Sequence, residues 1–570
     1  MRISCRDGAI VDIGNGQNGP VWGSPVTKIA RGPVTLLFRG ALWIDDDPLD
    51  ETHPNLDALL ERGMQALLDR AEGRFWVVLF NSESKLLDLA TDPFAGYPLY
   101  LVREGGLLHI TDDPLEAGAF SSGDIDADTA AMVLTAGYTL CGRTLLKDVS
   151  TLGPGQHLTL APGQAGAVRN YIRAEREAAP GYENAEELVQ DIDESLKRIR
   201  HTGRRSVVFL SGGVDSRLLA SRLLASGSDF EAISWTGQRR EPGVMDDHGA
   251  GAALAAAAGA RHHSWQWSLE NFPASADPGI YRSAGLSNNF QVWPQGDGFL
   301  EQFSDALMLW GDETFGWGQT TTDLGGVFSQ LGFLTFKDER IAAFPDLLSM
   351  VLDRHPFPDS PDEASVSKWK QRLYSEERVS SFIMKNQLAV GGFTSSCSPF
   401  LSRRIVARFQ NTAPDLTNEK SLARRALEIS QPSAFAKIPF ADHPAFDPPG
   451  RSMILWRRHR DVITETLGQR TALSSVVNIK AYLHDLDHDE MAHRLRAANL
   501  EPTIQGVDRF LARTLPEELF RKISPGLRAY LRLNVNRPAG DAFPCLYAMQ
   551  RFLLKVEELK AKRAQSGKPF

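Results

Sequence analysis

The segment Ser211-Gly212-Gly213-Val214-Asp215-Ser216 has the residue types and spacing that point most directly to chemistry. It follows the apolar run 206–210 and precedes a helical pattern over 217–224, so it is predicted to join a buried strand to a helix. Glycines let the backbone come close to an anion, and the N–H groups at a helix start point toward that anion. The segment, called loop 211–216 below, is therefore predicted to bind a phosphate group, although a plain glycine turn between strand and helix is the alternative. It lacks the lysine of the Gly-x-x-x-x-Gly-Lys-Ser/Thr loop found in common nucleotide hydrolases.

The elements around loop 211–216 predict an α/β fold. Short apolar runs that alternate with helical patterns indicate a doubly wound parallel sheet covered by helices on both faces. Three runs are predicted as its strands: 206–210, 230–235 and 306–310. An alanine-rich helix is predicted to end near Gly259, and residues after about 365 are mostly helical in pattern.

The first 170 residues are predicted to form a β-rich, layered domain. Three of the apolar or alternating runs that support it are 34–38, 75–80 and 107–110. A polar stretch with Pro180-Gly181 then precedes an amphipathic helix predicted over 184–200. The predicted domains are therefore residues 1–175 and 184–570.

Length and composition bound the class of protein. At 570 residues the chain is too long for one hydrophobic core. With 42% apolar residues and a net charge of −9, the composition excludes a wholly disordered chain and argues against a protein held mainly to nucleic-acid phosphates. The longest apolar runs are too short to cross a membrane, and the polar start does not resemble a secretory signal, so a cytoplasmic protein without a membrane partner is expected. The cysteines, far apart in sequence, are expected to be reduced and buried.

Loop 211–216 after a strand resembles the pyrophosphate loop of the N-type ATP pyrophosphatases, which cleave ATP between the α and β phosphates. The whole chain is similar to the asparagine synthetase family, which joins such a domain to an N-terminal glutamine-hydrolase domain. The N-terminal segments that carry this resemblance are Gly73-Arg74-Phe75-Trp76-Val77-Val78-Leu79-Phe80, Asp92-Pro93-Phe94-Ala95-Gly96-Tyr97-Pro98-Leu99-Tyr100 and Leu152-Gly153-Pro154-Gly155. The C-terminal segments are Gly311-Asp312-Glu313-Thr314-Phe315-Gly316, Ser398-Pro399-Phe400-Leu401 and Lys437. The resemblance implies an N-terminal Ntn-hydrolase-like αββα sandwich of inactive glutaminase type. For the C-terminal part, the resemblance implies a doubly wound ATP pyrophosphatase domain with a helical extension.

The same resemblance implies ATP and Mg²⁺ as cofactors and a set of site residues. Those expected to contact ATP are Leu210, Ser211, Gly212, Gly213, Val214, Asp215, Ser216, Ile233, Ser234 and Gly311. Asp215 and Asp312 are expected to hold Mg²⁺, because this ion takes carboxylate and phosphate oxygens and the ends of parallel strands meet at one sheet edge. Lys437 is expected to act with these two aspartates in catalysis by neutralising charge on the α-phosphate and on the tetrahedral oxyanion. A solvated acidic turn and a surface lysine are the alternatives for Asp312 and Lys437.

Departures from the family pattern direct the functional prediction. The glutamine-hydrolysing relatives need a cysteine directly after the initiator methionine, and Arg2 stands there. Cys5 is not expected to replace that cysteine, because the chemistry uses the nucleophile's own α-amino group as the base. Arg39-Gly40 falls where the family has an Asn-Gly that binds glutamine. The N-terminal domain is therefore predicted to make no ammonia.

A chain that adenylates a carboxylate but makes no ammonia is predicted to use an amine supplied with the substrate. Two branches of the family do this, the β-lactam and carbapenam synthetases and the lasso peptide cyclases. The first branch carries a glutamate four residues before the proline of the Pro-Phe-Leu element, where this chain has Ser395. A primary α-amine has less need of such a base, because its pKa lies near 8. The predicted function is therefore macrolactam formation in a ribosomal precursor peptide, between an Asp or Glu side chain and the N-terminal amine.

The resemblance to lasso cyclases further implies two partner proteins, a leader-binding protein and a leader peptidase. The alternatives to this prediction are β-lactam-type ring closure of a small molecule and an ammonia-dependent asparagine synthetase relative.

Overall fold

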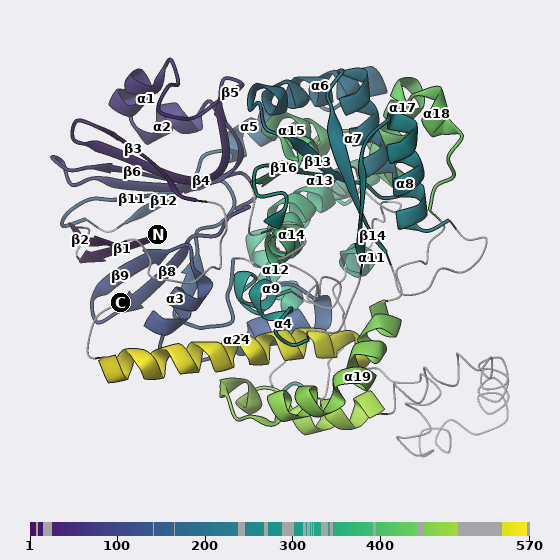
Figure 1. Ribbon diagram of the computed structural model, residues 1–570. Helices are drawn as coiled ribbons and strands as arrows, with labels where there is room; N and C mark the ends of the chain where they lie inside the picture. The colour runs from purple at the N-terminus through teal and green to yellow at the C-terminus, as the bar shows by residue number, and fades with distance from the viewer. Residues whose placement is uncertain are drawn as a thin grey trace, which may run out of the picture.

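Antiparallel sheets occupy the first part of the chain, and a parallel sheet with many helices occupies the rest (Figure 1). The structure is a computed structural model. It describes residues 1–6, 9–14, 25–140, 142–164, 166–236, 245–266, 272–287, 301–311, 315, 320, 322, 324–331, 340–342, 346–391, 395–441, 448–487 and 539–566.

Short strands build the two antiparallel sheets. Their bounds are β1 (Arg2–Arg6), β2 (Ala9–Gly14), β3 (Thr27–Arg31), β4 (Val34–Ile44), β5 (Asp47–Pro48), β6 (Ala71–Asn81), β7 (Leu87–Thr91), β8 (Tyr100–Glu104), β9 (Leu107–Thr111), β10 (Val149–Thr151), β11 (Gln156–Leu160) and β12 (Ala167–Asn170). One sheet has the order β10-β8-β9-β1-β2 and the other the order β12-β11-β7-β6-β4-β3, with β5 paired to β4. The strands predicted at 34–38, 75–80 and 107–110 are confirmed within β4, β6 and β9.

Helices cover the outer face of each antiparallel sheet. They are α1 (Leu56–Arg62), α2 (Met64–Leu68), α3 (Pro114–Phe120) and α4 (Ala127–Ala136). Helices α1 and α2 share a core with β4 and β6, whereas α3 and α4 share one with β8. A third core, which includes Ile3, Trp76 and Ile110, joins the two sheets to each other. This part of the chain is therefore layered as helices, sheet, sheet and helices.

The parallel sheet carries loop 211–216. Its strands are β13 (Ser206–Phe209), β14 (Phe230–Thr236), β15 (His262–Gln266), β16 (Leu307–Trp310) and β17 (Ser396–Cys397). They have the order β15-β14-β13-β16-β17, and each neighbouring pair is parallel. The end of β13 therefore lies between the ends of β14 and β16, which places loop 211–216 at the centre of the carboxyl edge.

The two faces of the parallel sheet are covered differently. The helices α6 (Ala185–His201), α7 (Val214–Ala225), α8 (Asp247–Ala258) and α17 (Ser421–Ser430) share a core with one face. An aromatic cluster that includes Phe209, Trp265, Trp310 and Phe303 covers the other face. The predicted parallel sheet is confirmed. Among the described residues, the helices that share the larger core of this sheet lie on one face, and helices on both faces stay a prediction.

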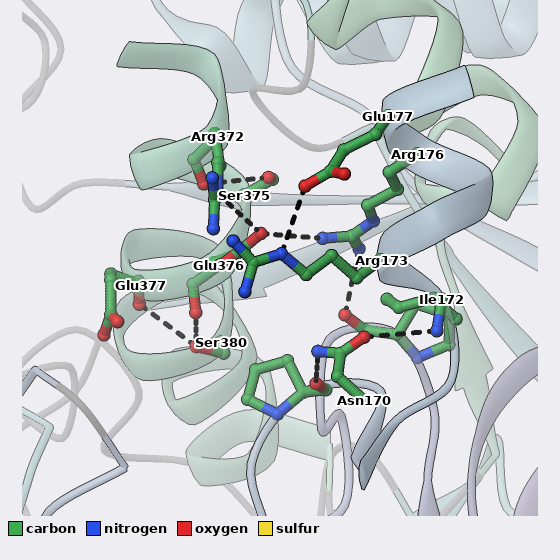
Figure 2. Close-up of polar contacts among 12 residues, drawn as sticks. Asn170, Ile172, Arg173, Arg176, Glu177, Arg372, Ser375, Glu376, Glu377 and Ser380 are labelled. Carbon is green, nitrogen blue, oxygen red and sulfur yellow. Dashed lines mark hydrogen bonds and ion pairs between the residues drawn. The ribbon is translucent and has the colours of Figure 1, made fainter. Parts of the chain in front are cut away.

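A short helix that the sequence did not predict crosses the expected boundary between the domains. It is α5 (Arg173–Ala178), and it lies against the π-helix η2 (Tyr374–Ile383). Figure 2 shows the Arg176 guanidinium of α5 beside the Glu376 carboxylate. The two groups form an ion pair with an N–O distance of 4.0 Å. Arg372 donates to the same carboxylate, and Arg176 also donates to the Pro93 carbonyl. The boundary segment is therefore held by contacts to both parts of the chain.

The remaining helices pack around both parts. They are α9 (Asp277–Arg282), α11 (Leu324–Gln330), α12 (Leu347–Arg354), α13 (Glu363–Leu373), α14 (Met384–Gly391), η3 (Pro399–Leu401), α15 (Arg403–Gln410), α16 (Pro414–Thr417), η4 (Asn418–Lys420), α18 (Ser433–Ala436), α19 (Pro448–Gly468), η5 (Ala472–Ser475) and α24 (Ala539–Ser566). The long helix α24, yellow in Figure 1, runs along α3, α4, α9 and α19. No helix in these described residues is both long enough and apolar enough to span a bilayer.

Candidate functional site

Loop 211–216 leaves the sheet at the end of β13 and enters α7 at Val214. Close packing requires glycine at Gly212, because a Cβ there would lie 2.4 Å from the Ala441 Cβ and 2.9 Å from the Ala250 Cβ. Gly311, at the end of β16, approaches equally closely, since a Cβ there would lie 2.7 Å from the Ser216 Cα. A Cβ on Gly213 would meet only the Ser211 hydroxyl, at 3.3 Å. The loop is therefore closed on the side of Gly212 and open at Gly213.

Hydrogen bonds among the loop's own residues fix its shape. The Ser211 and Ser216 hydroxyls lie 2.9 Å apart, and the Ser216 hydroxyl donates to the Ser211 carbonyl at 3.1 Å. The Gly213 N–H donates to the Ser211 hydroxyl at 3.2 Å. Ser211 and Ser216, which are expected to contact ATP, therefore brace the loop in the structure.

The start of α7 presents backbone donors beside this loop. Gly213 is the residue before the first helical turn, and no side chain caps the helix there. The first N–H groups of a helix lack partners within the helix, and the helix dipole favours an anion near them. The first turn of α7 therefore offers backbone donors of the kind that bind phosphate, whereas phosphate binding by loop 211–216 stays a prediction.

Asp215 is buried and carries an ion pair that the sequence did not predict. Its carboxylate accepts a hydrogen bond from the Lys420 ammonium, and the exposed fractions of the two side chains are 7% and 20%. Lys420 and the preceding Glu419 both have left-handed backbone angles, with φ values of 59° and 54°. Such angles are rare in residues other than glycine and are costly for adjacent residues. The Lys420 ammonium thus lies beside the Asp215 carboxylate, where a divalent cation bound to that carboxylate would also lie.

Contacts of the adjacent residues Thr417 and Asn418 hold the turn at Glu419 and Lys420 in place. The Asn418 amide oxygen accepts from the backbone N–H and the hydroxyl of Thr320, both at 2.9 Å. The Asn418 amide nitrogen donates to Glu363 at 3.1 Å, and the Thr417 and Ser367 hydroxyls lie 3.3 Å apart. These contacts anchor the turn to α13 and support the strained backbone at Lys420.

A second side chain that the sequence did not predict, from the start of α8, accepts a hydrogen bond from the loop. Asp247 is the first residue of α8, and its carboxylate accepts the Gly212 N–H at 3.0 Å. Its neighbour Asp246 caps α8 by accepting the Gly249 N–H. Gly251, one turn further along α8, lies so close to Ser234 that a Cβ would come within 2.2 Å of the Ser234 hydroxyl. Helix α8 therefore lies directly against the loop and the end of β14.

Arg217 brings the segment with Lys437 to the loop. Its guanidinium is buried and donates to the Ile438 carbonyl at 2.7 Å and the Pro439 carbonyl at 2.8 Å. It also stacks on the Phe440 ring at 4.2 Å. Residues 435–441 therefore run across the start of α7. The Lys437 side chain itself is exposed, so the structure places its segment beside the loop without pairing it with Asp215.

The sheet edge at Leu210, Ile233 and Ser234, which are expected to contact ATP, is polar and partly occupied by protein contacts. Ile233 is buried in β14, and its carbonyl accepts the Leu210 N–H at 2.9 Å. The Ser234 hydroxyl donates to the Leu210 carbonyl and lies 3.1 Å from the His262 Nε2. Burial, and then the nearby imidazoles of His248 and His263, lowers the pKa of His262 to about 4. A neutral imidazole therefore borders this edge at physiological pH.

The residues present fit a magnesium nucleotide in three respects. The loop backbone can take phosphate oxygens, Asp215 can supply a carboxylate ligand, and Lys420 shows that the position beside Asp215 accepts a cation. Asp312, the second predicted magnesium ligand, lies outside the described residues. Within the described residues no group of three or more His, Cys, Asp or Glu side chains could hold a metal ion by itself. Phosphate oxygens would therefore have to complete the coordination of Mg²⁺.

Among the described residues of the N-terminal domain, Cys5 does not have the surroundings of a cysteine nucleophile. Cys5 is buried in β1, and burial raises its thiol pKa to about 11. Arg39 is buried in β4 and donates to the Asp112 carboxylate at 2.8 Å. Burial alone would favour protonated Asp112, but Arg39 and the terminal ammonium of Met1 lower its pKa below the usual value. A thiol with a raised pKa is a poor nucleophile.

Among the described residues, those that sequence reasoning missed are Lys420, Asp247 and Arg217. Lys420 is 205 residues from Asp215, so no local pattern connects them. The Asp246-Asp247 pair before the alanine-rich helix was a signal, since aspartate is favoured at a helix start. Arg217 follows the loop directly, and an arginine among apolar helix positions indicates a buried partner.

A cavity also lies at the junction of the two parts of the chain. Its lining includes Trp43, Arg74, Phe94, Met384 and Cys397, and no residue of loop 211–216. Comparison of the chain with protein-family models found no match, and no curated protein matches its sequence significantly.

Proposed function

We propose that the protein is an ATP-dependent amide ligase that adenylates a carboxylate and joins it to an amine of the same peptide. The observation that carries this proposal is the arrangement of loop 211–216. The loop connects a buried parallel strand to an uncapped helix, its Asp215 side chain is buried, and Arg217 holds residues 435–441 across the start of that helix. This arrangement suits the pyrophosphate loop that the sequence resembles.

In the proposed reaction ATP is a substrate, with its β- and γ-phosphates on loop 211–216 and its adenine beside Leu210 and Ile233. Mg²⁺, held by Asp215 and Asp312, would neutralise phosphate charge. A carboxylate oxygen of the peptide attacks the α-phosphorus, and the bond to the bridging oxygen of the β-phosphate breaks. Pyrophosphate leaves, and a mixed anhydride of the carboxylate and AMP remains.

In the second half of the reaction the peptide amine attacks the carbonyl carbon. The nitrogen loses a proton, the bond from carbon to the AMP oxygen breaks, and a lactam and AMP are formed. Lys437 lies in the segment that Arg217 holds across the start of α7. We propose that its ammonium stabilises negative charge on the α-phosphate and the tetrahedral oxyanion. Proximity of amine and carboxylate in one folded peptide supplies the orientation that the reaction requires.

The substrate class follows from what the N-terminal domain lacks. Its buried Cys5 and its Arg39–Asp112 ion pair support a domain that supplies no ammonia. Ser395 supplies no carboxylate at the position that carries the glutamate in β-lactam-forming relatives. We therefore propose macrolactam formation in a precursor peptide, an Ntn-hydrolase-like αββα origin for the N-terminal domain, and leader-binding and leader-peptidase partners.

The test is release of pyrophosphate and AMP from ATP in the presence of Mg²⁺ and a peptide that carries an N-terminal amine and an internal Asp or Glu. We expect equal amounts of AMP and of a product lighter than the peptide by one water. Asp215→Ala is expected to lower the rate by at least about 100-fold, because it removes a metal ligand and a buried charge.

Two outcomes would contradict the proposal. Full activity of Asp215→Ala would show that the loop is not the nucleotide site. Stoichiometric asparagine and AMP from aspartate, ammonium and ATP would show that the substrate is a free amino acid.

A further inference from the structure

Two charged side chains outside the predicted site form hydrogen bonds to residues of loop 211–216. Lys420 reaches Asp215 from the turn before α17, and Asp247 reaches the Gly212 N–H from the start of α8. An ammonium thus lies where the carboxylate of Asp215 would meet a metal cation. A carboxylate lies where the loop N–H would meet a phosphate oxygen.

We propose that Lys420 and Asp247 are internal counter-ions of the site and exchange their partners when a magnesium nucleotide binds. Lys420 leaves Asp215 to the metal and turns to the phosphates, and Asp247 yields the Gly212 N–H to a phosphate oxygen. This inference rests on the proposed function, because it needs a nucleotide at loop 211–216.

The backbone conformation of the turn at Glu419 and Lys420 supports a role of Lys420 beyond packing. Glu419 and Lys420 are consecutive residues with left-handed angles, and both have side chains with a Cβ. Strain of this kind persists only where the surroundings over-determine it, and it is concentrated at functional sites. Here the surroundings are the contacts of Asn418 to Thr320 and Glu363. The turn therefore presents one ammonium at a fixed place beside loop 211–216.

The position of Asp247 argues against a role in helix capping. Asp246 already caps α8 through the Gly249 N–H, at 2.6 Å. The Asp247 carboxylate instead accepts a hydrogen bond from the N–H group of Gly212, which lies outside α8. A negative charge at this place repels a triphosphate, so its effect on nucleotide affinity is opposite to that of Lys420.

The experiment measures binding of α,β-methylene-ATP with Mg²⁺ by titration calorimetry, which needs no turnover. We expect Asp247→Asn to bind this analogue about fivefold more tightly, because a like charge is removed while the amide oxygen can still accept the Gly212 N–H. Asp246→Asn is the matched control, because it removes the same charge one residue away. Its affinity is expected to change by less than that of Asp247→Asn. Equal or weaker binding by Asp247→Asn than by wild type would overturn the proposal.

Lys420→Met is expected to bind the analogue about tenfold more weakly, the loss that corresponds to one charge-assisted hydrogen bond to phosphate. Lys420→Arg is expected to keep most of the affinity, since it keeps the charge. The control Lys197→Met removes an exposed lysine on α6 and is expected to bind as wild type does. Wild-type affinity in Lys420→Met would overturn the proposal.

A second measurement requires no nucleotide and separates a charge role from a folding role. Mg²⁺ alone is expected to raise the melting temperature of Lys420→Met more than that of wild type or Lys420→Arg, because the metal takes the place of the ammonium at Asp215. An equal response of the three proteins would overturn the exchange. If wild type itself fails to bind the analogue, the proposed function fails first. If wild type binds it and the variants do not differ, only this inference fails.

Discussion

Arg217 shows how a single residue assembles the candidate site. It belongs to α7, yet its buried guanidinium donates to carbonyls of residues 435–439, about 220 positions later in the chain. Arginine suits this role because its planar fork offers several donors at once and keeps its charge. Burial lowers the pKa of Arg217, but the group remains charged at any physiological pH. One side chain therefore fixes the distance between the loop and the segment that carries Lys437.

His262 gives a prediction for pH dependence at the scale of one residue. Its folded-state pKa of about 4 lies below the ordinary value of 6.5, so the unfolded chain binds more protons between these two pH values. The contribution of His262 to stability is therefore complete above pH 6.5 and is lost as the pH falls toward 4. His262→Gln removes the titration and can keep a hydrogen bond to the Ser234 hydroxyl.

We expect the fall in melting temperature between pH 7 and pH 5 to be smaller in His262→Gln than in wild type by about 2 °C. Differential scanning calorimetry at both pH values measures this difference. His201→Gln, in which an exposed histidine is replaced, is the control and should follow wild type. Parallel curves for wild type and His262→Gln would contradict the assigned pKa.

At the scale of elements, the two glycines of loop 211–216 have different surroundings. A Cβ at Gly212 would lie 2.4 Å from the Ala441 Cβ, whereas a Cβ at Gly213 would meet only a hydroxyl at 3.3 Å. Gly213 has φ −76° and ψ 166°, angles that alanine adopts freely. The same substitution therefore tests packing at one position and the open side of the loop at the next.

We expect Gly212→Ala to destabilise the protein by about 1–3 kcal/mol, because the new methyl group forces α8 or residue 441 to move. Gly213→Ala is expected to keep wild-type stability within about 0.5 kcal/mol and to bind α,β-methylene-ATP more weakly, because its methyl group stands where the phosphates approach. Urea unfolding and titration calorimetry measure the two effects. Wild-type nucleotide affinity in a folded Gly213→Ala would place the phosphates elsewhere.

The elements also show what the sequence could predict. Strands β4, β6, β13, β14 and β16 were predictable, because each is a run of apolar residues between turn-formers. Strand β15 was not, because its sequence His-His-Ser-Trp-Gln is polar and it lies at the sheet edge. The loop was predictable because its glycines and its position between strand and helix are local features. Lys420 was not, because its ion pair depends on the packing of α17 against α7.

At the scale of the whole molecule, the first and second parts of the chain are joined by buried polar contacts. Arg74 of β6 donates to Gln387 at 2.6 Å and to Ser396 at 2.7 Å, and it also donates to the Gly96 carbonyl. Arg403 donates to the Leu68 carbonyl at 2.7 Å. Ser396 belongs to β17, the edge strand of the parallel sheet, so the junction is continuous with the sheet that carries loop 211–216.

Helix α24 reinforces this junction from a second side. Arg563 pairs with Glu104 of β8, and Arg551 pairs with Asp277 of α9. Gly118 of α3 approaches α24 so closely that a Cβ would lie 2.4 Å from a Val556 methyl. Because the junction contacts and the contacts of α24 both join the first and second parts of the chain, we expect these two parts to unfold together.

Arg74→Met tests this coupling, because it removes the buried guanidinium and keeps a long apolar side chain. The substitution leaves Gln387, Ser396 and the Gly96 carbonyl without their donor, and it removes the contact with the Tyr97 ring. We expect a loss of about 3 kcal/mol in the free energy of unfolding, since buried hydrogen bonds to a charged group are lost. Scanning calorimetry should show one transition at a lower temperature. Arg103→Met, at an exposed position of β8, is the control and should melt as wild type does. Two separate transitions, of which only one responds to Arg74→Met, would show instead that the parts fold independently and that the junction does not transmit stability to the sheet that carries the candidate site.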